Sequence, residues 1–207
     1  MDFAKVLLKS GLVPTSFNTP EKVVAAIQQG RELGMSGITA LNNIYVIEGK
    51  PSLSVHAIGA LLRKANVAWQ TVRNYEPEYE VDPITGEQIF YKAGGNNADG
   101  TSKYIKTTKE DGGKLRKVDT VTTIKFFRKW EGRVIEEVVD FRWSEAIAQG
   151  LVTKHNWTTK GRLMLWNRCL AVGGRRVAPD ALLGMYEVSE MAETKNITIE
   201  LDGEGNP

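Results

Sequence analysis

The sequence predicts an α+β fold, in which β-hairpins form a small, mostly antiparallel sheet packed against helices, with a long C-terminal amphipathic helix. Two observations lead to this class. Strand-forming segments come in pairs around short turns, at residues 44–54 and 118–143, which is typical of hairpins. These pairs do not alternate regularly with helices, as the strands of a parallel sheet would. A chain of 207 residues is also long enough to bury one sizeable core.

The first helices are predicted from their ends. The opening residues are too weakly apolar for a secretory signal and predict a short amphipathic helix ending at Gly11. Thr19 and Pro20 are typical of an N-cap and a first helical residue, and Gly34 is typical of a C-terminal stop. We therefore expect a helix from about residue 20 to Gly34.

The stretch LNNIYVIEGKPSLS, residues 41–54, predicts a tight hairpin that leads directly into a helix. Strand-forming residues 44–47 precede Glu48 and Gly49, a turn pair in which the glycine can take positive φ. Ser52 or Ser54 then caps the next helix, because a serine oxygen can accept a bond from a free first-turn N–H. In that helix, apolar residues recur at i, i+3, i+4 and i+7: Ile58, Leu61, Leu62 and Ala65.

The middle of the chain predicts strands and a long insertion. Residues 67–81 are rich in aromatic and β-branched residues and predict a strand interrupted near Pro77. Residues 82–117 carry many turn signals, with short strand-like pieces that contain Lys103 and Lys106. We expect this segment to be a flexible basic insertion.

A second hairpin is predicted around Glu131-Gly132, and its first strand is partly basic, with Lys125, Arg128 and Lys129 beside two phenylalanines. Ser144 is predicted to cap a short helix that Gly150 closes.

We see no internal domain boundary, so residues 1–191 are expected to form one core domain. Residues 192–207 form an acidic C-terminal tail.

The net charge is only +2, but its distribution is uneven. Residues 92–176 hold 18 Lys and Arg against 9 Asp and Glu, whereas the rest of the chain is acidic. A basic middle between acidic ends favours a polyanion as partner, although a solvated positive face explains it equally well.

The predicted late helix, from about Thr159 to Val177, concentrates this charge. Its spacing of about 100° per residue divides it into two faces. One face is apolar: Leu163, Trp166, Leu170 and Val177. The opposite face is cationic: Arg162, Arg168, Arg175 and Arg176. Four neighbouring guanidiniums repel one another, so they need either an external anion or a salt-bridge network with acidic neighbours: Glu136, Glu137 and Asp140. Gly173-Gly174 indicates either the close approach of another backbone, of protein or nucleic acid, or the end of the helix.

The segment KHNW just before this helix has the residue types of a nucleic-acid contact. Lys154 offers a charge to phosphate, Asn156 an amide to a base or sugar, and Trp157 a ring on which a base can stack. A tryptophan at such a position is also a common core residue.

Motifs for catalysis are absent. The chain has no P-loop, and Cys169 is its only cysteine, which excludes an internal disulfide. Its two histidines, His56 and His155, leave a zinc centre short of ligands. We therefore expect a non-enzymatic protein without cofactor or metal. Two other classes stay open: a structural or assembly protein whose basic face binds an acidic protein partner, and a nuclease that uses carboxylates and Mg²⁺.

Three segments resemble the RecT family of phage single-strand annealing proteins: GRELGMSGITALNNIYVIEGKPSLS, RWSEAIAQGL and NWTTKGRLMLWNRCLAVGGRRVAPDALLGMYEVSEM. The resemblance covers about residues 19–66 and 119–191. It implies ATP-independent binding of single-stranded DNA and annealing of complementary strands in homologous recombination, in the cytoplasm of a bacterial host. It also implies a homo-oligomeric ring or helical filament that holds the DNA in a basic groove.

On this resemblance, the partners are single-stranded DNA, the annealed duplex and further copies of the chain, with a phage exonuclease or a host single-strand binding protein as additional candidates. Lys50 would face a phosphate or a neighbouring subunit, although a lysine in a polar turn needs no such role. The predicted DNA-binding residues are Lys50, Lys103, Lys106, Lys125, Arg128, Lys129, Lys154, Asn156, Trp157, Arg162, Arg168, Arg175 and Arg176.

Overall fold

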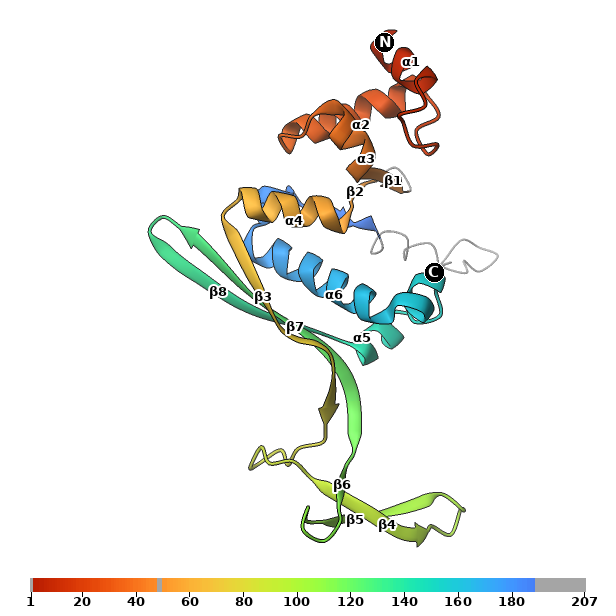
Figure 1. Cartoon of the computed structure of the whole chain (residues 1–207), viewed down its shortest axis with the longest axis vertical. Helices are drawn as coiled ribbons and strands as arrows, with labels where there is room; N and C mark the ends of the chain where they lie inside the picture. Colours follow the sequence, from red (N-terminus) through yellow and green to blue (C-terminus); the bar gives the residue numbers. More distant parts are fainter. Residues whose placement is uncertain (1, 48–49, 189–207) are drawn as a thin grey trace, which may run out of the picture. The chain divides into compact units, whose positions relative to one another are not determined.

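The computed structural model describes residues 2–47 and 50–188 and shows the expected α+β fold (Figure 1). The chain divides into two compact units. The first unit comprises Met1–Gln70, Ile124–Val139 and Asn167–Pro207, and the second comprises Thr71–Thr123 and Asp140–Trp166. The acidic tail predicted at residues 192–207 lies outside the described residues.

Figure 1 labels the helices and strands. The first unit holds α1 Asp2–Lys9, α2 Pro20–Glu32, α3 Gly37–Asn43, β1 Ile44–Ile47, β2 Lys50–Leu53, α4 Val55–Lys64, α7 Pro179–Leu182 and β9 Tyr186–Glu187. The second unit holds β4 Phe90–Asn96, β5 Ser102–Thr107, β6 Lys114–Leu115 and α5 Trp143–Ala148. Four elements contribute residues to both units: β3 Val67–Tyr79, β7 Lys117–Trp130, β8 Arg133–Arg142 and α6 His155–Val177.

Several helix ends follow from local sequence chemistry, as predicted. Thr19 Oγ1 accepts a hydrogen bond from the backbone N–H of Lys22 at the start of α2, and Pro20 is its first residue. Of the two candidate serines, Ser54 caps α4 by accepting from the N–H of Ala57 at 3.0 Å. Gly34, with φ of +68°, follows the end of α2.

The first hairpin is confirmed outside its turn. Strands β1 and β2 pair in antiparallel register from Ile44 opposite Leu53 to Ile47 opposite Lys50. The turn predicted at residues 48–49 lies outside the described residues. Strand β9 adds a parallel partner to β2 and completes a sheet of order β1-β2-β9, which the hairpin pattern does not predict.

The second hairpin joins β7 to β8 within a sheet of order β3-β7-β8. Both turn residues, Glu131 and Gly132, have positive φ, of 46° and 78°, as a type I′ turn requires. The interruption predicted near Pro77 is wrong, because β3 continues through it to Tyr79. The backbone irregularity of this strand lies instead at Tyr75, which has a φ of 62°.

Residues 82–117, predicted as a flexible basic insertion, contain a third sheet of order β5-β4-β6.

The N-terminus of α5 differs from the prediction that Ser144 caps it. That helix begins before Ser144, and a Glu145 carboxylate oxygen accepts from the backbone N–H of Arg142 at 3.0 Å. The Ser144 hydroxyl donates to Asp119 instead.

Helix α6 departs most from the predicted two-faced pattern. Lys160 interrupts its backbone with φ of −135° and ψ of 36°. Leu163, expected on the packed face, is 51% exposed, whereas Arg168, expected on the open face, is only 5% exposed. Gly173 makes room for a side chain and not for a backbone: a Cβ there would clash with the ring of Phe126 on β7.

Among the described residues, no helix has both the length and the apolar character needed to cross a bilayer.

Candidate nucleic-acid interface

The predicted row of four free arginines on α6 is wrong. Arg168 is buried, and Arg176 lies 3.5 Å from a carboxylate oxygen of Glu137 on β8. Arg175 is half-buried with its guanidinium 4.8 Å from the ring of Tyr186, and burial lowers its pKa. Only Arg162 is both exposed and without an ion pair to any described residue.

The segment before α6 also differs from its predicted role. Trp157 is 2% exposed and packs against Trp143, with ring centroids 5.9 Å apart, so it cannot stack on a base. Its apolar ring is a core residue of the second unit, which is the alternative that the sequence left open. Lys154 is half-buried, and Asn156 is exposed.

On the second hairpin, two of the three predicted cations are engaged within the chain. Lys125 Nζ lies 2.7 Å from Glu136 and 5.0 Å from the Phe127 ring. Arg128 is 5% exposed and held by Asp180 through two hydrogen bonds of 2.6 Å. The prediction that Arg128 contacts phosphate is therefore wrong, whereas Lys129 is exposed.

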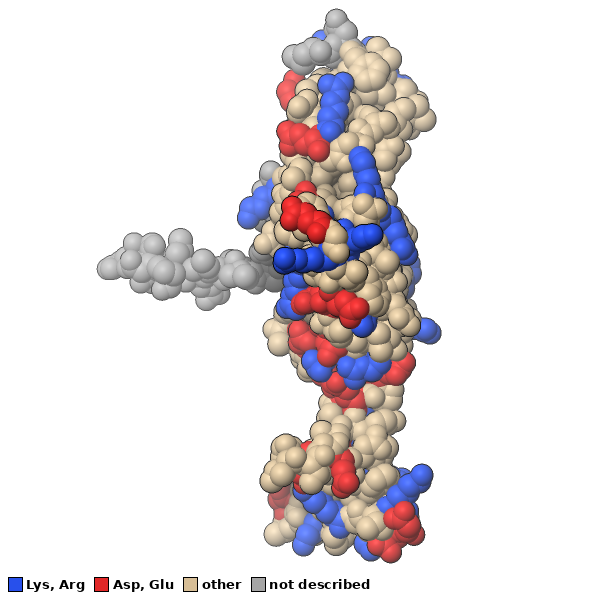
Figure 2. Space-filling view, turned by 90° about the vertical axis from the view of Figure 1, so that its left-hand side faces the viewer, with Lys and Arg blue, Asp and Glu red and all other residues tan. Residues whose placement is uncertain are grey.

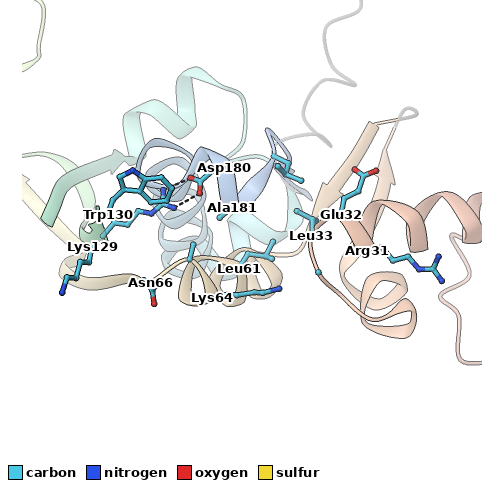
Figure 3. Close-up of a pocket in the computed structure, with 14 residues that line it drawn as sticks. Arg31, Glu32, Leu33, Leu61, Lys64, Asn66, Lys129, Trp130, Asp180 and Ala181 are labelled. Atoms are coloured by element: carbon cyan, nitrogen blue, oxygen red, sulfur yellow. Dashed lines mark hydrogen bonds and ion pairs between the residues drawn. The ribbon is translucent and has the colours of Figure 1, made fainter. Parts of the chain in front are cut away.

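A pocket of about 460 Å³ lies in the first unit, where the ends of α2, α4 and β7 and the start of α7 meet (Figure 3). Its lining includes four cationic side chains and two carboxylates: Arg31, Lys64, Arg128 and Lys129, with Glu32 and Asp180. In Figure 3, Lys129, Asn66 and Lys64 follow one another along one side of the pocket. An added Cβ at Gly34 would meet the ammonium group of Lys64, so this glycine leaves room for the lysine head group.

Trp130 gives this pocket a fixed aromatic surface. Trp130 as a whole is 47% exposed, and its ring lies over the guanidinium of Arg128, 4.4 Å from Cζ to the ring centroid. Asp180 binds that guanidinium from α7, and the Val177 carbonyl accepts a further bond from Arg128 at 3.0 Å. A ring held in this way has little freedom left to lose when a planar ligand stacks on its open side.

The Arg128–Asp180 pair also sets the electrostatics of the pocket. The two hydrogen bonds from Arg128 lower the pKa of Asp180, and the same bonds raise the pKa of Arg128. Both groups therefore stay charged and compensate each other over the whole working pH range. The uncompensated charge of the lining comes mainly from exposed cations: Arg31, Lys64 and Lys129.

The remaining predicted cations are exposed but belong to different elements. Lys50 begins β2, and Lys103 and Lys106 lie on β5. Acidic and basic side chains are interspersed over the face shown in Figure 2. Burial removes three of the thirteen predicted residues from any binding surface: Arg128, Trp157 and Arg168.

Sequence reasoning missed Trp130, Lys64 and Arg31. Strand alternation could have indicated Trp130, because it shares a face of β7 with Phe126 and Arg128. No sequence signal could have shown that Arg31 and Lys64 line the same pocket as Trp130, because this shared lining arises from tertiary packing.

Among the described residues, no group of acidic, histidine and cysteine side chains could hold a metal ion. Comparison of the chain with protein families, with curated proteins and with solved structures finds no match.

Proposed function

We propose that this chain binds single-stranded DNA and anneals complementary strands without ATP, as a RecT-like homo-oligomeric annealing protein. The observation that carries the proposal is the exposed Trp130 side chain, whose ring is fixed on Arg128 in a pocket that exposed cations also line. Stacking rings beside cations are the usual means of holding a nucleic-acid strand without reading its sequence.

The chemistry of this pocket suits annealing. Lys64, Lys129 and Arg31 neutralise phosphates, which reduces the repulsion between two complementary strands. Trp130 contacts the flat face of a base and so leaves the pairing edge of that base free. Holding a strand in one geometry lowers the entropic cost of finding the complementary register.

Binding of a fluorescent 30-nucleotide oligothymidine, followed by anisotropy, tests the proposal. Trp130→Ala should weaken binding roughly five- to 150-fold, because loss of one stacked base costs about 1–3 kcal/mol. Trp130→Phe should retain most of the affinity. Lys129→Gln and Lys64→Gln should each reduce the log–log salt slope by about 0.7.

Lys9→Gln on α1 is the matched control, because it removes an exposed cation outside the pocket lining. If Trp130→Ala and Lys129→Gln bind like Lys9→Gln, this pocket is not the DNA site. If the wild-type chain neither binds nor anneals oligonucleotides, the assembly-protein alternative becomes the better explanation of its charge.

A further inference from the structure

The sheet β5-β4-β6 of the second unit places tyrosines and cations on one face. Tyr91 on β4 pairs with Lys106 on β5 and with Lys114 on β6, and Ala93 pairs with Tyr104. Paired residues of antiparallel strands point to the same face, as do alternate residues along one strand. The tyrosine–lysine face is therefore defined by Tyr91, Tyr104, Lys106, Lys114 and Arg116, whose guanidinium lies 4.9 Å from the Tyr91 ring centroid.

A pocket of about 530 Å³ opens at this face. Its lining has no carboxylate and combines two tyrosines with four cations: Tyr91, Tyr104, Lys92, Lys114, Arg116 and Lys117. Arg116 has an internal partner, because Glu80 forms an ion pair with it. Lys106 and Lys114 are exposed and form no ion pair with any described residue. The surface therefore carries positive charge that ion pairs within the described residues do not compensate.

Tyr104 is the residue that specifies the kind of ligand. Tyr104 as a whole residue is 57% exposed beside these cations, so it offers an open ring to a planar group. An acidic peptide would need only the cations, and a duplex hides the flat faces of its bases. An unpaired strand supplies both phosphates and accessible base faces.

We propose that the tyrosine–lysine face is a second contact for single-stranded nucleic acid, independent of the Trp130 pocket. Lys106 and Lys114 hold phosphates on either side of Tyr91, and Tyr104 stacks on a base. This inference rests on the proposed function and extends it, because annealing needs more than one place at which a strand is held.

The test compares binding of the full chain to a 30-nucleotide oligothymidine and to an abasic deoxyribose–phosphate strand of the same length. Tyr104→Ala should weaken oligothymidine binding roughly five- to 150-fold and leave abasic binding unchanged, whereas Tyr104→Phe should preserve both. The double variant Lys106→Gln, Lys114→Gln should lower the salt slope by about 1.4 for both ligands. Lys109→Gln is the matched control, because it removes an exposed cation of the same unit that does not line this pocket, and it should leave the slope unchanged.

If Tyr104→Ala and the double lysine variant both bind like Lys109→Gln, the inference is overturned. If Trp130→Ala weakens binding in that same experiment, only this second contact is rejected and the proposed function stands. If the wild-type chain binds neither strand, the proposed function and this inference both fail.

Discussion

At the scale of single residues, a charge network in the second unit shows how ion pairs within the chain engage basic side chains that could otherwise bind an external anion. Arg142 donates to both carboxylate oxygens of Glu78, at 2.7 and 3.0 Å. Arg73 reaches Glu78 at 3.2 Å and Asp140 at 3.4 Å. Thr123 joins the network by accepting from Arg73 and donating to Asp140. Arg73 and Arg142 therefore stabilise the folded second unit through these ion pairs.

Glu78→Gln should make stability less dependent on pH. The hydrogen bonds from Arg142, followed by those from Arg73, lower the pKa of Glu78 below its ordinary value of 4.5. A lowered carboxyl pKa stabilises the folded state fully above that ordinary value, and the contribution is lost as pH falls through the folded-state pKa. Melting temperatures of the wild type and variant should differ by about 2–8 °C at pH 7 and converge as the pH falls below the folded-state pKa of Glu78.

Glu76→Gln is the control for this measurement, because Glu76 is exposed on the same strand and makes no ion pair with a described residue. A pH profile of Glu78→Gln that runs parallel to the wild type would contradict the role given to this carboxylate.

At the scale of elements, the packing of α6 against β7 in the first unit depends on a glycine, Gly173, which has no Cβ. Gly173 faces the ring of Phe126, which is fully buried. Gly174 faces the side chains of Leu62 and Leu182. The two glycines let buried side chains approach the helix backbone, at the cost of helix propensity.

Gly173→Ala should lower stability by about 1–3 kcal/mol, because the Phe126 ring must move to admit a Cβ. Gly59→Ala in α4 is the matched control. The nearest atom to a Cβ there is a Trp69 ring carbon at 3.7 Å, an ordinary contact, so this variant should gain about 0.5–1 kcal/mol. Urea unfolding measures the change in the free energy of unfolding for both variants. Equal changes would show that helix propensity alone, and not the contact with Phe126, determines the effect of each substitution.

Features set by adjacent residues could be predicted from the sequence. The caps at Thr19 and Ser54 and the turn at Glu131-Gly132 depend on side chains and backbone freedom within a few positions. The two faces of α6 could not be predicted, because the helix is broken at Lys160 and is buried on more than one side. The burial of Arg168 follows from that enclosure.

The candidate site was predictable only in part, for a related reason. Lys129 was predicted and is exposed at the pocket, but the fixed position of Trp130 depends on Asp180. That carboxylate binds Arg128 from 52 positions away in the sequence. Contacts of such sequence separation come from tertiary packing, which spacing and periodicity do not encode.

At the scale of the whole molecule, the proposed annealing activity would require the charges to act together on a long polyanion. The annealing rate of complementary oligonucleotides without ATP should fall steeply as salt rises, because each neutralised phosphate releases counterions. The protomer of 23.0 kDa should also form larger species when single-stranded DNA is added. Light scattering with and without DNA measures this, and an unchanged mass would reject the oligomeric part of the proposal.

The short strand β9 has a consequence for such mass measurements. It occupies one side of β2 through pairs of Ser52 with Tyr186 and Leu53 with Glu187. A chain truncated before Tyr186 would leave the backbone donors and acceptors on that side of β2 bare, and an uncovered sheet margin attracts strands from other molecules. Shortened versions of this protein would then cluster through a surface that the intact chain keeps closed, and their size would imitate an assembly built on DNA.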